Sequence, residues 1–193
     1  MWPSVIEKEN GREKIYDIPS RLLLDRIIML TETIDSGIAA SIIGQLLYLE
    51  SQNPEEPITM YINSPGGSIT DGLAIYDIMN KINCPVNTVC TGMAASMAAF
   101  LLCAGTGTRY AMPNSTIMIH QPLGGVQGQA TDIAIVANRI LNLKTKLYKI
   151  FAQKSGSSYE TISAACERDN YLSPSEAQSL GLIDKIVNEE KEQ

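Results

Sequence analysis

The stretch from Pro85 to Gly105 constrains the fold most, because it joins two apolar runs through a cluster of small residues. The first run, Val86 to Cys90, has the length and composition of a buried strand. The second run opens at Ser96 and suits a buried helix. The small residues between them, Thr91 to Ala95, predict a tight turn. The stretch therefore predicts a strand, a turn and a helix in that order.

The same order of elements occurs earlier in the chain. Arg26 to Leu30 predicts a strand, and Asp35 offers an N-cap for a helix through Leu49. Ile58 to Ile62 predicts the next strand, followed by the loop Ser64–Ser68 and a helix through about residue 82. Strands that alternate with helices at this spacing predict an α/β fold with a layered, largely parallel sheet. A length of 193 residues fits a single domain, residues 1–193.

The remaining regions complete this pattern. Three further short strands are predicted, at Arg109–Met112, Thr116–His120 and Ile183–Val187. Two helices are predicted to open with capping boxes, Ser157 with Glu160 and Ser173 with Glu176. Residues 1–14 are expected to form a flexible N-terminal segment, and residues 188–193 a solvated tail.

A long helix with one apolar stripe is predicted after the glycine-rich segment 121–130. Thr131 or Asp132 offers its cap. Its apolar residues recur at spacings of three and four: Ile133, Val136, Ile140, Leu143, Leu147 and Ile150. About 20 residues at 1.5 Å each span roughly 30 Å, so the helix should project beyond a small domain. An exposed stripe of that length favours self-association, and residues 121–155 are therefore interpreted as a protruding handle.

The composition limits the classes of partner. Its 15 basic and 21 acidic residues give a net charge of −6 without a basic cluster, which disfavours nucleic acid and acidic membrane surfaces. The apolar run Met97–Ala104 is too short to span a bilayer, and the charged N-terminus does not read as a secretory signal. The four cysteines show no metal-binding spacing. These features predict a reduced, cytoplasmic protein without a membrane partner or bound metal.

Three polar residues follow apolar elements, where α/β proteins collect functional groups: Ser96, His120 and Asp169. A serine hydroxyl at the positive end of a helix is well placed to become a nucleophile, and it needs a base such as imidazole. The chain has one histidine, so any Ser–His mechanism must use His120. A carboxylate would then orient the imidazole. Spacing alone does not choose between Asp169, Glu167 and Asp132 for this third role.

Each of these residues also has a simpler interpretation. Ser96 would merely cap a helix, His120 would be a buried imidazole bonded to backbone, and Asp169 would belong to an ion-pair cluster with Glu167 and Arg168. The pair Gly66-Gly67 would similarly be an ordinary Pro-Gly turn.

The glycine pair also has a functional interpretation. Two glycines between a strand and a helix expose backbone N–H groups and permit close approach of a substrate. The amides of Gly67 and Met97 would together form an oxyanion hole. A phosphate-binding P-loop is not supported, because no Gly-Lys-Ser/Thr follows the glycines.

Four ordered motifs carry a family resemblance: YINSPGGSITDGLAIYD, GMAASMAAFLL, MPNSTIMIHQPLGG with QGQATDI, and ERDNYLSPSEAQSLGLID. Together they resemble the proteolytic subunit of the Clp protease, from about Asn10 to Val187. The resemblance implies a crotonase-like fold and a serine peptidase with Ser96 as nucleophile, His120 as base and Asp169 as orienting carboxylate. It also implies an oxyanion hole from the amides of Gly67 and Met97.

The resemblance also implies a substrate site and an assembly. Peptide would lie extended between a strand after Gly67 and a strand after Leu123, against Gly66, Ser68, Ile69, Leu123 and Gly124. The long helix and a strand at Gly124–Gln129 would form the handle that joins two stacked seven-membered rings, a tetradecamer with its active sites in a closed chamber. The ring–ring contacts implied are Gln129, Asp132, Glu167 and Arg168. An AAA+ unfoldase would deliver unfolded proteins and use the ATP, so this chain itself needs no cofactor.

The sequence departs from the family pattern in three places. Ala98 stands where the family often has glycine, and the turn at 104–110 is one residue shorter than usual. Lys81 and Asn83-Cys84-Pro85 replace a segment that often reads aromatic-Ile-Lys-Pro-Asp, although Tyr61 keeps an aromatic nearby. Because that aromatic usually helps to form the cleft where the unfoldase docks, these changes suggest altered docking and a paralogue that works in mixed rings.

Two other functions remain open on the sequence alone. A crotonase-like acyl-CoA enzyme would use the same pair of amides, but Ser96 and His120 would then be superfluous. A catalytically weak structural ring subunit would instead activate a paralogue, which the departures above favour.

Overall fold

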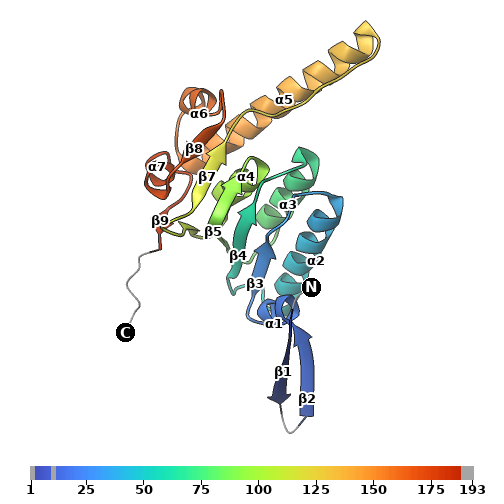
Figure 1. Ribbon diagram of the computed structural model, residues 1–193, viewed down its shortest axis with the longest axis vertical. Helices are drawn as coiled ribbons and strands as arrows, with labels where there is room; N and C mark the ends of the chain where they lie inside the picture. Colours follow the sequence, from blue (N-terminus) through green and yellow to red (C-terminus); the bar gives the residue numbers. More distant parts are fainter. Residues whose placement is uncertain (1–2, 10–11, 188–193) are drawn as a thin grey trace.

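A mostly parallel sheet forms the centre of the computed structural model, which describes residues 3–9 and 12–187 (Figure 1). Its seven strands follow the order β3-β4-β5-β6-β9, and β7 joins through β5 and carries β8. The strands are β3 (Ile27–Leu30), β4 (Ile58–Ser64), β5 (Val86–Ala95), β6 (Arg109–Ala111), β7 (Thr116–Ile119), β8 (Asn170–Leu172) and β9 (Lys185–Ile186). Every pair is parallel except β7 with β8. The predicted α/β fold is confirmed.

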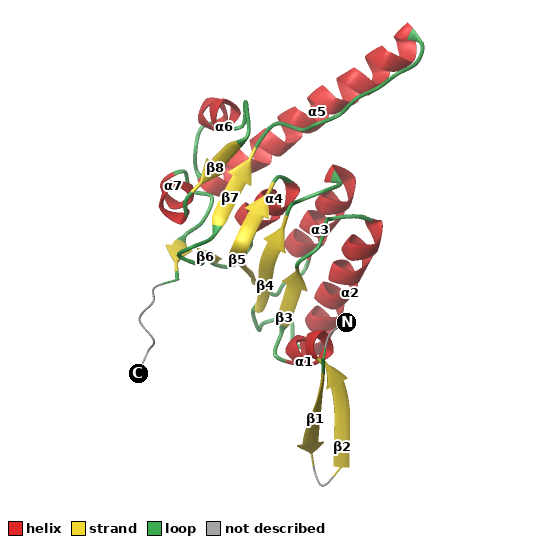
Figure 2. Cartoon of the chain, viewed as in Figure 1, coloured by secondary structure: helices red, strands yellow, loops and turns green. Residues whose placement is uncertain are grey.

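Helices cover one face of this sheet, where α2, α3 and α4 lie behind the strands (Figure 2). The helices are α1 (Ile18–Leu24), α2 (Ser36–Gln52), α3 (Ile69–Lys81), α4 (Met97–Cys103), α5 (Ala130–Ser155), α6 (Tyr159–Ala165) and α7 (Pro174–Ser179). Alternate residues of β4 are buried, namely Ile58, Met60 and Ile62, and α4 is buried throughout. The core therefore lies between the sheet and these helices. None of the helices in the described part of the chain is both long and apolar enough to cross a membrane.

Strand β5 is longer than the sequence predicts, because the small residues Thr91–Ala95 continue the strand instead of forming a turn. They pair in parallel with β7 from Met93 to Ala95, so a second strand binds their backbone groups. A positive φ of 76° at Gly92 and a register shift opposite β4 accommodate the change of partner. Met93 N donates a hydrogen bond to Asn63 Oδ1 (3.1 Å) at the same place. The extension delivers Ser96 to the end of β5.

Helix α5 projects beyond the rest of the molecule, as the apolar stripe predicts (Figure 1). It begins after Gln129 and not at a cap on Thr131 or Asp132, and it ends at Gly156 with φ 74°. Its buried residues are confined to the last third, namely Leu147, Tyr148 and Phe151. Gly124–Gln129 forms no strand, because no strand of the described chain pairs with it. This segment instead runs along α5, where a Cβ at Gly124 would lie 2.6 Å from Ile140 Cδ1.

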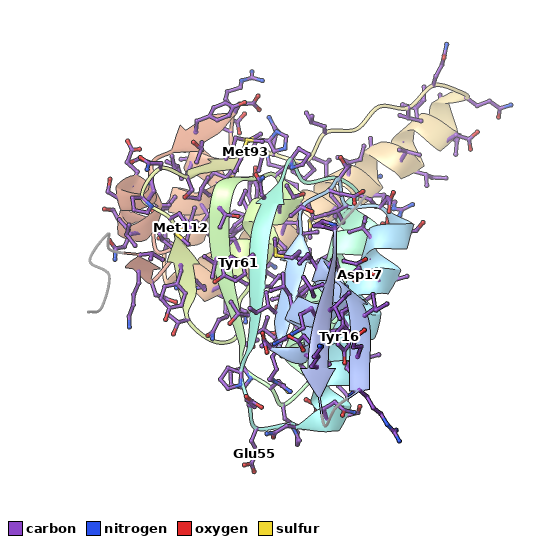
Figure 3. All side chains as sticks on the ribbon, turned by 60° about the horizontal axis from the view of Figure 1, so that its bottom comes forward. Tyr16, Asp17, Glu55, Tyr61, Met93 and Met112 are labelled. Carbon is purple, nitrogen blue, oxygen red and sulfur yellow. The ribbon has the colours of Figure 1, made fainter. Side chains whose placement is uncertain are left out.

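An antiparallel hairpin of β1 (Ser4–Glu9) and β2 (Arg12–Asp17) replaces most of the expected flexible N-terminal segment. Each strand carries a pair of residues that favour strands, Val5 with Ile6 and Ile15 with Tyr16, and Ile6 pairs with Ile15 across the hairpin. Figure 3 shows Tyr16 and Asp17 on the second strand. Arg21 of α1 forms an ion pair with Glu7 and so fixes the base of the hairpin. Residues 1–2, 10–11 and the predicted tail 188–193 lie outside the described residues.

The two predicted capping boxes differ in outcome. Ser173 and Glu176 form the expected box at the start of α7. At α6 the cap is Ser158, which accepts a hydrogen bond from Thr161 N, so the predicted Ser157 box is wrong by one residue. Ser157 Oγ instead donates to the carbonyl oxygen of Leu180 (3.0 Å).

Arg109 anchors the C-terminal part of the fold, and its replacement by methionine is expected to lower the free energy of unfolding by about 2–4 kcal/mol. Its guanidinium binds the Asp184 carboxylate and donates to three carbonyl oxygens, those of Cys103, Lys154 and Gly181. The same guanidinium lowers the pKa of Asp184. A lowered pKa stabilises the folded state at neutral pH, and this contribution is lost as the pH falls below about 4.

Urea unfolding between pH 3 and pH 7 measures both effects. Arg109→Met should lower the stability at pH 7 and flatten its fall on acidification. Lys149→Met changes an exposed lysine on α5 in the same way, and it should alter neither the stability at pH 7 nor the fall in stability on acidification. Equal stability curves for the two variants would contradict the anchoring role of Arg109.

Candidate active site

Ser96 occupies the sharp junction between β5 and α4. Its φ of 56° and ψ of −121° are unusual for a residue with a side chain, and such strain is a common property of functional sites. The Ser96 N–H donates to the carbonyl oxygen of Met118 on β7 (2.8 Å). Ser96 stands at the N-cap position of α4, but its side chain makes no capping hydrogen bond, so it is not merely a helix cap. The hydroxyl oxygen lies instead 2.8 Å from His120 Nε2.

His120 lies directly after β7, and β7 pairs with the end of β5, which brings the imidazole next to Ser96. The side chain is 11% exposed. Its Nδ1 lies 3.1 Å from Asp169 Oδ1. A carboxylate cannot donate a proton, so this contact favours the tautomer with hydrogen on Nδ1. Nε2 is then free to accept the proton of Ser96. Both ring nitrogens thus contact side chains, contrary to the simpler interpretation of an imidazole bonded to backbone.

Asp169 reaches the site because β8 follows it and pairs antiparallel with β7. Ile119 is opposite Asn170 in this pairing, so the residue before β8 lies beside the residue after β7. The structure thereby separates Asp169 from the other two candidate carboxylates. Glu167 instead forms an ion pair with Lys144, whose Nζ lies 3.7 Å from Glu167 Oε2. Asp132 lies in the first turn of α5, at its projecting end (Figure 1).

The glycine pair packs against the backbone of the Ser96 junction. Gly66 has φ 90°, and a Cβ there would lie 2.5 Å from the carbonyl oxygen of Ala95 and 2.8 Å from Ser96 Cβ. Gly67, with φ 149°, forms an isolated parallel bridge with Ile34. Ile34 N donates to the Gly66 carbonyl oxygen and Ser68 N donates to the Ile34 carbonyl oxygen, each at 2.8 Å. The pair is therefore more than an exposed Pro-Gly turn.

A cleft of about 420 Å³ opens over Ser96 and His120. Its lining comprises Pro65, Gly67, Ser68, Ile69, Thr70, Ser96, Met118, His120, Pro122 and Leu123. A smaller apolar pocket of about 30 Å³ continues from Ser96 toward Phe100, Leu147, Tyr148 and Phe151. The site thus places a hydroxyl, an imidazole and a carboxylate beside a cleft with a small apolar recess.

Only some of the predicted substrate-binding residues lie in the cleft. Ser68, Ile69 and Leu123 line the cleft, whereas Gly66 is buried against Ser96 and Gly124 lies against α5. The flanking segments are not the strands that the resemblance implies. Helix α3 begins at Ile69, directly after the glycine pair. Residues 121–129 form no strand and pair with no strand of the described chain. A partner strand for them would have to come from a substrate or another subunit.

Gln129, Asp132, Glu167 and Arg168 are all exposed, as residues of a contact surface would be. Gln129 and Asp132 lie at the projecting end of α5, and Glu167 and Arg168 lie beside Asp169. Their role in ring–ring contacts stays a prediction. Gln121 and Lys144, whose side chains bond to each other next to the site, are not indicated by any sequence pattern.

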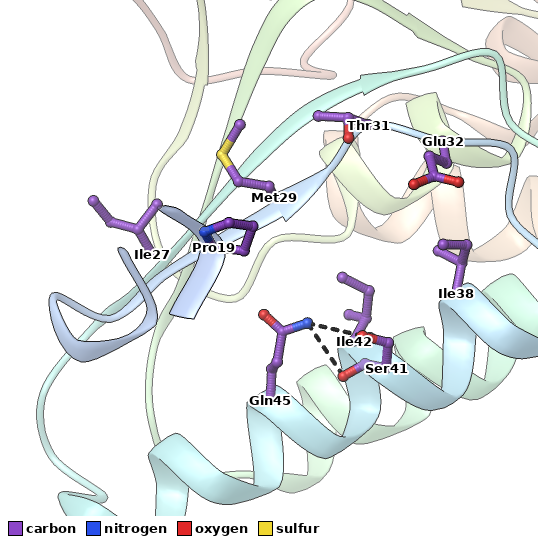
Figure 4. A pocket seen from close by; sticks show the side chains of 9 residues that line it. All are labelled: Pro19, Ile27, Met29, Thr31, Glu32, Ile38, Ser41, Ile42 and Gln45. Atoms are coloured by element: carbon purple, nitrogen blue, oxygen red, sulfur yellow. Dashed lines mark hydrogen bonds between the residues drawn. The ribbon is translucent and has the colours of Figure 1, made fainter. Parts of the chain in front are cut away.

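A second hollow of about 140 Å³ lies between α1, β3 and α2 (Figure 4). It is lined by Pro19, Ile27, Met29, Thr31, Glu32, Ile38, Ser41, Ile42 and Gln45. Glu32 is the one ionisable side chain in this lining, which contains no histidine, cysteine or lysine. Across residues 3–9 and 12–187, no group of three or more histidine, cysteine, aspartate or glutamate residues is arranged to hold a metal ion.

The fold and the site define an α/β protein with a Ser–His–Asp arrangement beside an open cleft. A family model described as Clp protease matches residues 9–190. The chain belongs to the Clp protease family. It is a ClpP-like protease subunit, which makes it a hydrolase that takes part in proteolysis.

Proposed function

We propose that the chain is a serine-type endopeptidase in which Ser96 is the nucleophile and His120 the general base. The single observation that carries the proposal is the alignment of three groups: Ser96 Oγ lies 2.8 Å from His120 Nε2, and His120 Nδ1 lies 3.1 Å from Asp169 Oδ1. Each distance permits the hydrogen bond that proton transfer requires. Asp169 holds the reactive tautomer and stabilises the imidazolium that forms.

The reaction follows from these positions. Ser96 Oγ attacks the peptide carbonyl carbon as its proton passes to His120 Nε2, and the amides of Gly67 and Met97 stabilise the resulting oxyanion. His120 then gives the proton to the leaving amine, and the C–N bond breaks. Water, deprotonated by His120, then attacks the carbonyl carbon of the acyl-enzyme. The ester C–O bond breaks, His120 returns the proton to Ser96 Oγ, and the acid is released. No metal or cofactor is required for any of these steps.

The lining of the cleft supports a peptide substrate, because apolar side chains and the backbone of Gly67 lie beside Ser96 and His120. Leu123 lies on one rim, 79% exposed, and Ser68 and Ile69 lie on the other. The backbone of residues 121–128 pairs with no strand of the described chain, so its N–H and C=O groups can bond to an extended peptide, which is how peptides add to a strand edge. The substrates are unfolded proteins, cut internally into short peptides.

The assembly proposed is a barrel of two stacked seven-membered rings joined through α5. Large apolar side chains are exposed on and beside the projecting half of this helix, namely Leu123, Val126, Ile133, Ile135 and Leu141. Exposed apolar surface of this kind marks an interface. A separate AAA+ unfoldase of the cytoplasm supplies the substrate and hydrolyses the ATP. Lys81 is exposed at the end of α3, consistent with altered docking of that partner.

Labelling with a fluorophosphonate probe tests the catalytic proposal. We expect one probe per chain on Ser96, because Nε2 can take the hydroxyl proton, and we expect His120→Ala to abolish the modification. Ser51→Ala, at an exposed serine of α2, should label like the wild type. A wild-type chain that resists the probe would instead support the alternative, a catalytically weak structural subunit that activates a paralogue.

A further inference from the structure

The amide of Gln121 joins two parts of the molecule that flank the site. Its Nε2 donates a hydrogen bond to the carbonyl oxygen of Glu167 (2.9 Å). Its Oε1 accepts one from Lys144 Nζ on α5 (3.2 Å). The ammonium can only donate and the carbonyl can only accept, so the two partners fix the orientation of the amide. Gln121 is therefore held at both ends, directly after His120.

Lys144, which donates to Gln121, is itself held by two further contacts. Its side chain is 26% exposed and its Nζ lies 3.7 Å from Glu167 Oε2. The same Nζ lies 5.5 Å from the centre of the Tyr148 ring, a distance typical of a cation–π contact. The ammonium thus contacts a carboxylate, an amide oxygen and an aromatic face. These contacts tie α5 to the segment 167–169.

Asp169 needs such a tie, because its own surroundings do little to hold it. Its side chain is 63% exposed, and Glu167 and Arg168 before it are exposed as well. A solvated carboxylate gains little from its one hydrogen bond to His120, since it must give up conformational freedom to make it. The backbone on its C-terminal side is held by β8, where Asn170 Nδ2 also donates to the Ala165 carbonyl oxygen (3.0 Å). On its N-terminal side, the Glu167 amide donates a long hydrogen bond to the Ala164 carbonyl oxygen (3.4 Å), and the Glu167 carbonyl oxygen accepts the shorter one from Gln121 (2.9 Å).

We propose that Lys144 and Gln121 are positioning residues for the peptidase reaction, which hold the Glu167–Asp169 backbone so that Asp169 reaches His120 Nδ1. This inference rests on the proposed function, and neither residue touches the reacting atoms. Lys144 fixes the amide of Gln121, Gln121 fixes the Glu167 carbonyl, and Asp169 lies two residues further on. Loss of either side chain should therefore weaken the orientation of the imidazole and not the binding of peptide.

Kinetics with a short peptide amide substrate test this division. Lys144→Met should lower kcat by about 10- to 100-fold, the effect of a displacement of about 1 Å at a catalytic group, with KM changed less than about threefold. Lys144→Arg keeps a cation within reach of Gln121 and should therefore retain most of the wild-type kcat. Gln121→Glu should fail like Lys144→Met, since a carboxylate cannot donate to the Glu167 carbonyl oxygen. Lys146→Met, at an exposed position on the same helix, should match the wild type.

The single histidine provides a readout that does not depend on activity. With [15N]histidine labelling, nuclear magnetic resonance of the sedimented protein reports the tautomer of His120 alone. The wild type and Lys146→Met should show one tautomer, with hydrogen on Nδ1. Lys144→Met and Gln121→Glu should show a mixture of tautomers while their melting temperatures stay within a few degrees of the wild type.

The outcomes are distinct. A single Nδ1–H tautomer in both Lys144→Met and Gln121→Glu would overturn the inference, whatever the activity of these variants. The inference would be supported by a mixture of tautomers in both Lys144→Met and Gln121→Glu together with a single Nδ1–H tautomer in Lys144→Arg. A wild type with the single tautomer that does not react with a fluorophosphonate would refute the proposed serine peptidase without refuting the positioning role.

Discussion

Replacement of Asp169 by asparagine is expected to lower kcat for a peptide substrate by about a thousandfold, with KM changed less than about threefold. Asparagine has nearly the shape of aspartate but lacks the negative charge. It can also present its NH2 group to Nδ1, which would favour the tautomer with hydrogen on Nε2 and remove the base for Ser96. Steady-state kinetics of peptide hydrolysis measure this effect.

Asp77→Asn on α3 serves as the matched control, because Asp77 is exposed and lies outside the cleft lining. This variant should keep the wild-type kcat. If Asp169→Asn retained more than about a tenth of the wild-type kcat, the carboxylate would not be the group that orients His120, and the 3.1 Å contact between Nδ1 and Oδ1 would be incidental.

Replacement of Gly66 by alanine is expected to reduce kcat by about a hundredfold or more, although Gly66 carries no functional group. The new Cβ would lie 2.5 Å from the Ala95 carbonyl oxygen, 2.8 Å from Ser96 Cβ and 2.9 Å from Met97 N. Two of these atoms belong to backbone, so relief requires movement of the junction that holds Ser96, the proposed nucleophile. The φ of 90° adds strain for any residue with a side chain. The rate of fluorophosphonate labelling and the melting temperature together measure the result.

Gly44→Ala on α2 is the control for a change of glycine to alanine. A Cβ at Gly44 meets no atom within 4 Å, and the position is exposed in a helix. The substitution should stabilise the fold by about 0.5–1 kcal/mol and leave activity unchanged. If Gly66→Ala labelled at the wild-type rate, the junction would tolerate the displacement, and the close packing of Gly66 against Ser96 would have no catalytic consequence.

Local sequence patterns were sufficient for most of the fold. The strands β3 and β4 and the helices α2, α3 and α5 follow from apolar periodicity and caps within a few residues of each element. The residues Thr91–Ala95 were wrongly predicted as a turn, because their strand conformation depends on pairing with β7, more than 20 residues later. Such long-range pairing leaves no trace in a short window of sequence.

The site was predictable where residue type alone limits the choice. One histidine restricts the base to His120, and Ser96 follows from the predicted strand–helix junction. The choice of Asp169 over Glu167 from residue patterns was not possible, since it depends on the pairing of β7 with β8. Gln121 and Lys144 were not predicted, because their side-chain contacts join segments that are 23 and 46 residues apart.

Helix α5 contains two regions of different stability. Its buried residues Leu147, Tyr148 and Phe151 nucleate the helix from the C-terminal end, so each further residue toward Gln129 adds one hydrogen bond without a new nucleation cost. The propagation free energy per residue is close to zero, and no core contact supports the first three turns in the described chain. The helix–coil boundary in an isolated subunit can therefore shift along α5 with temperature, while the base remains folded.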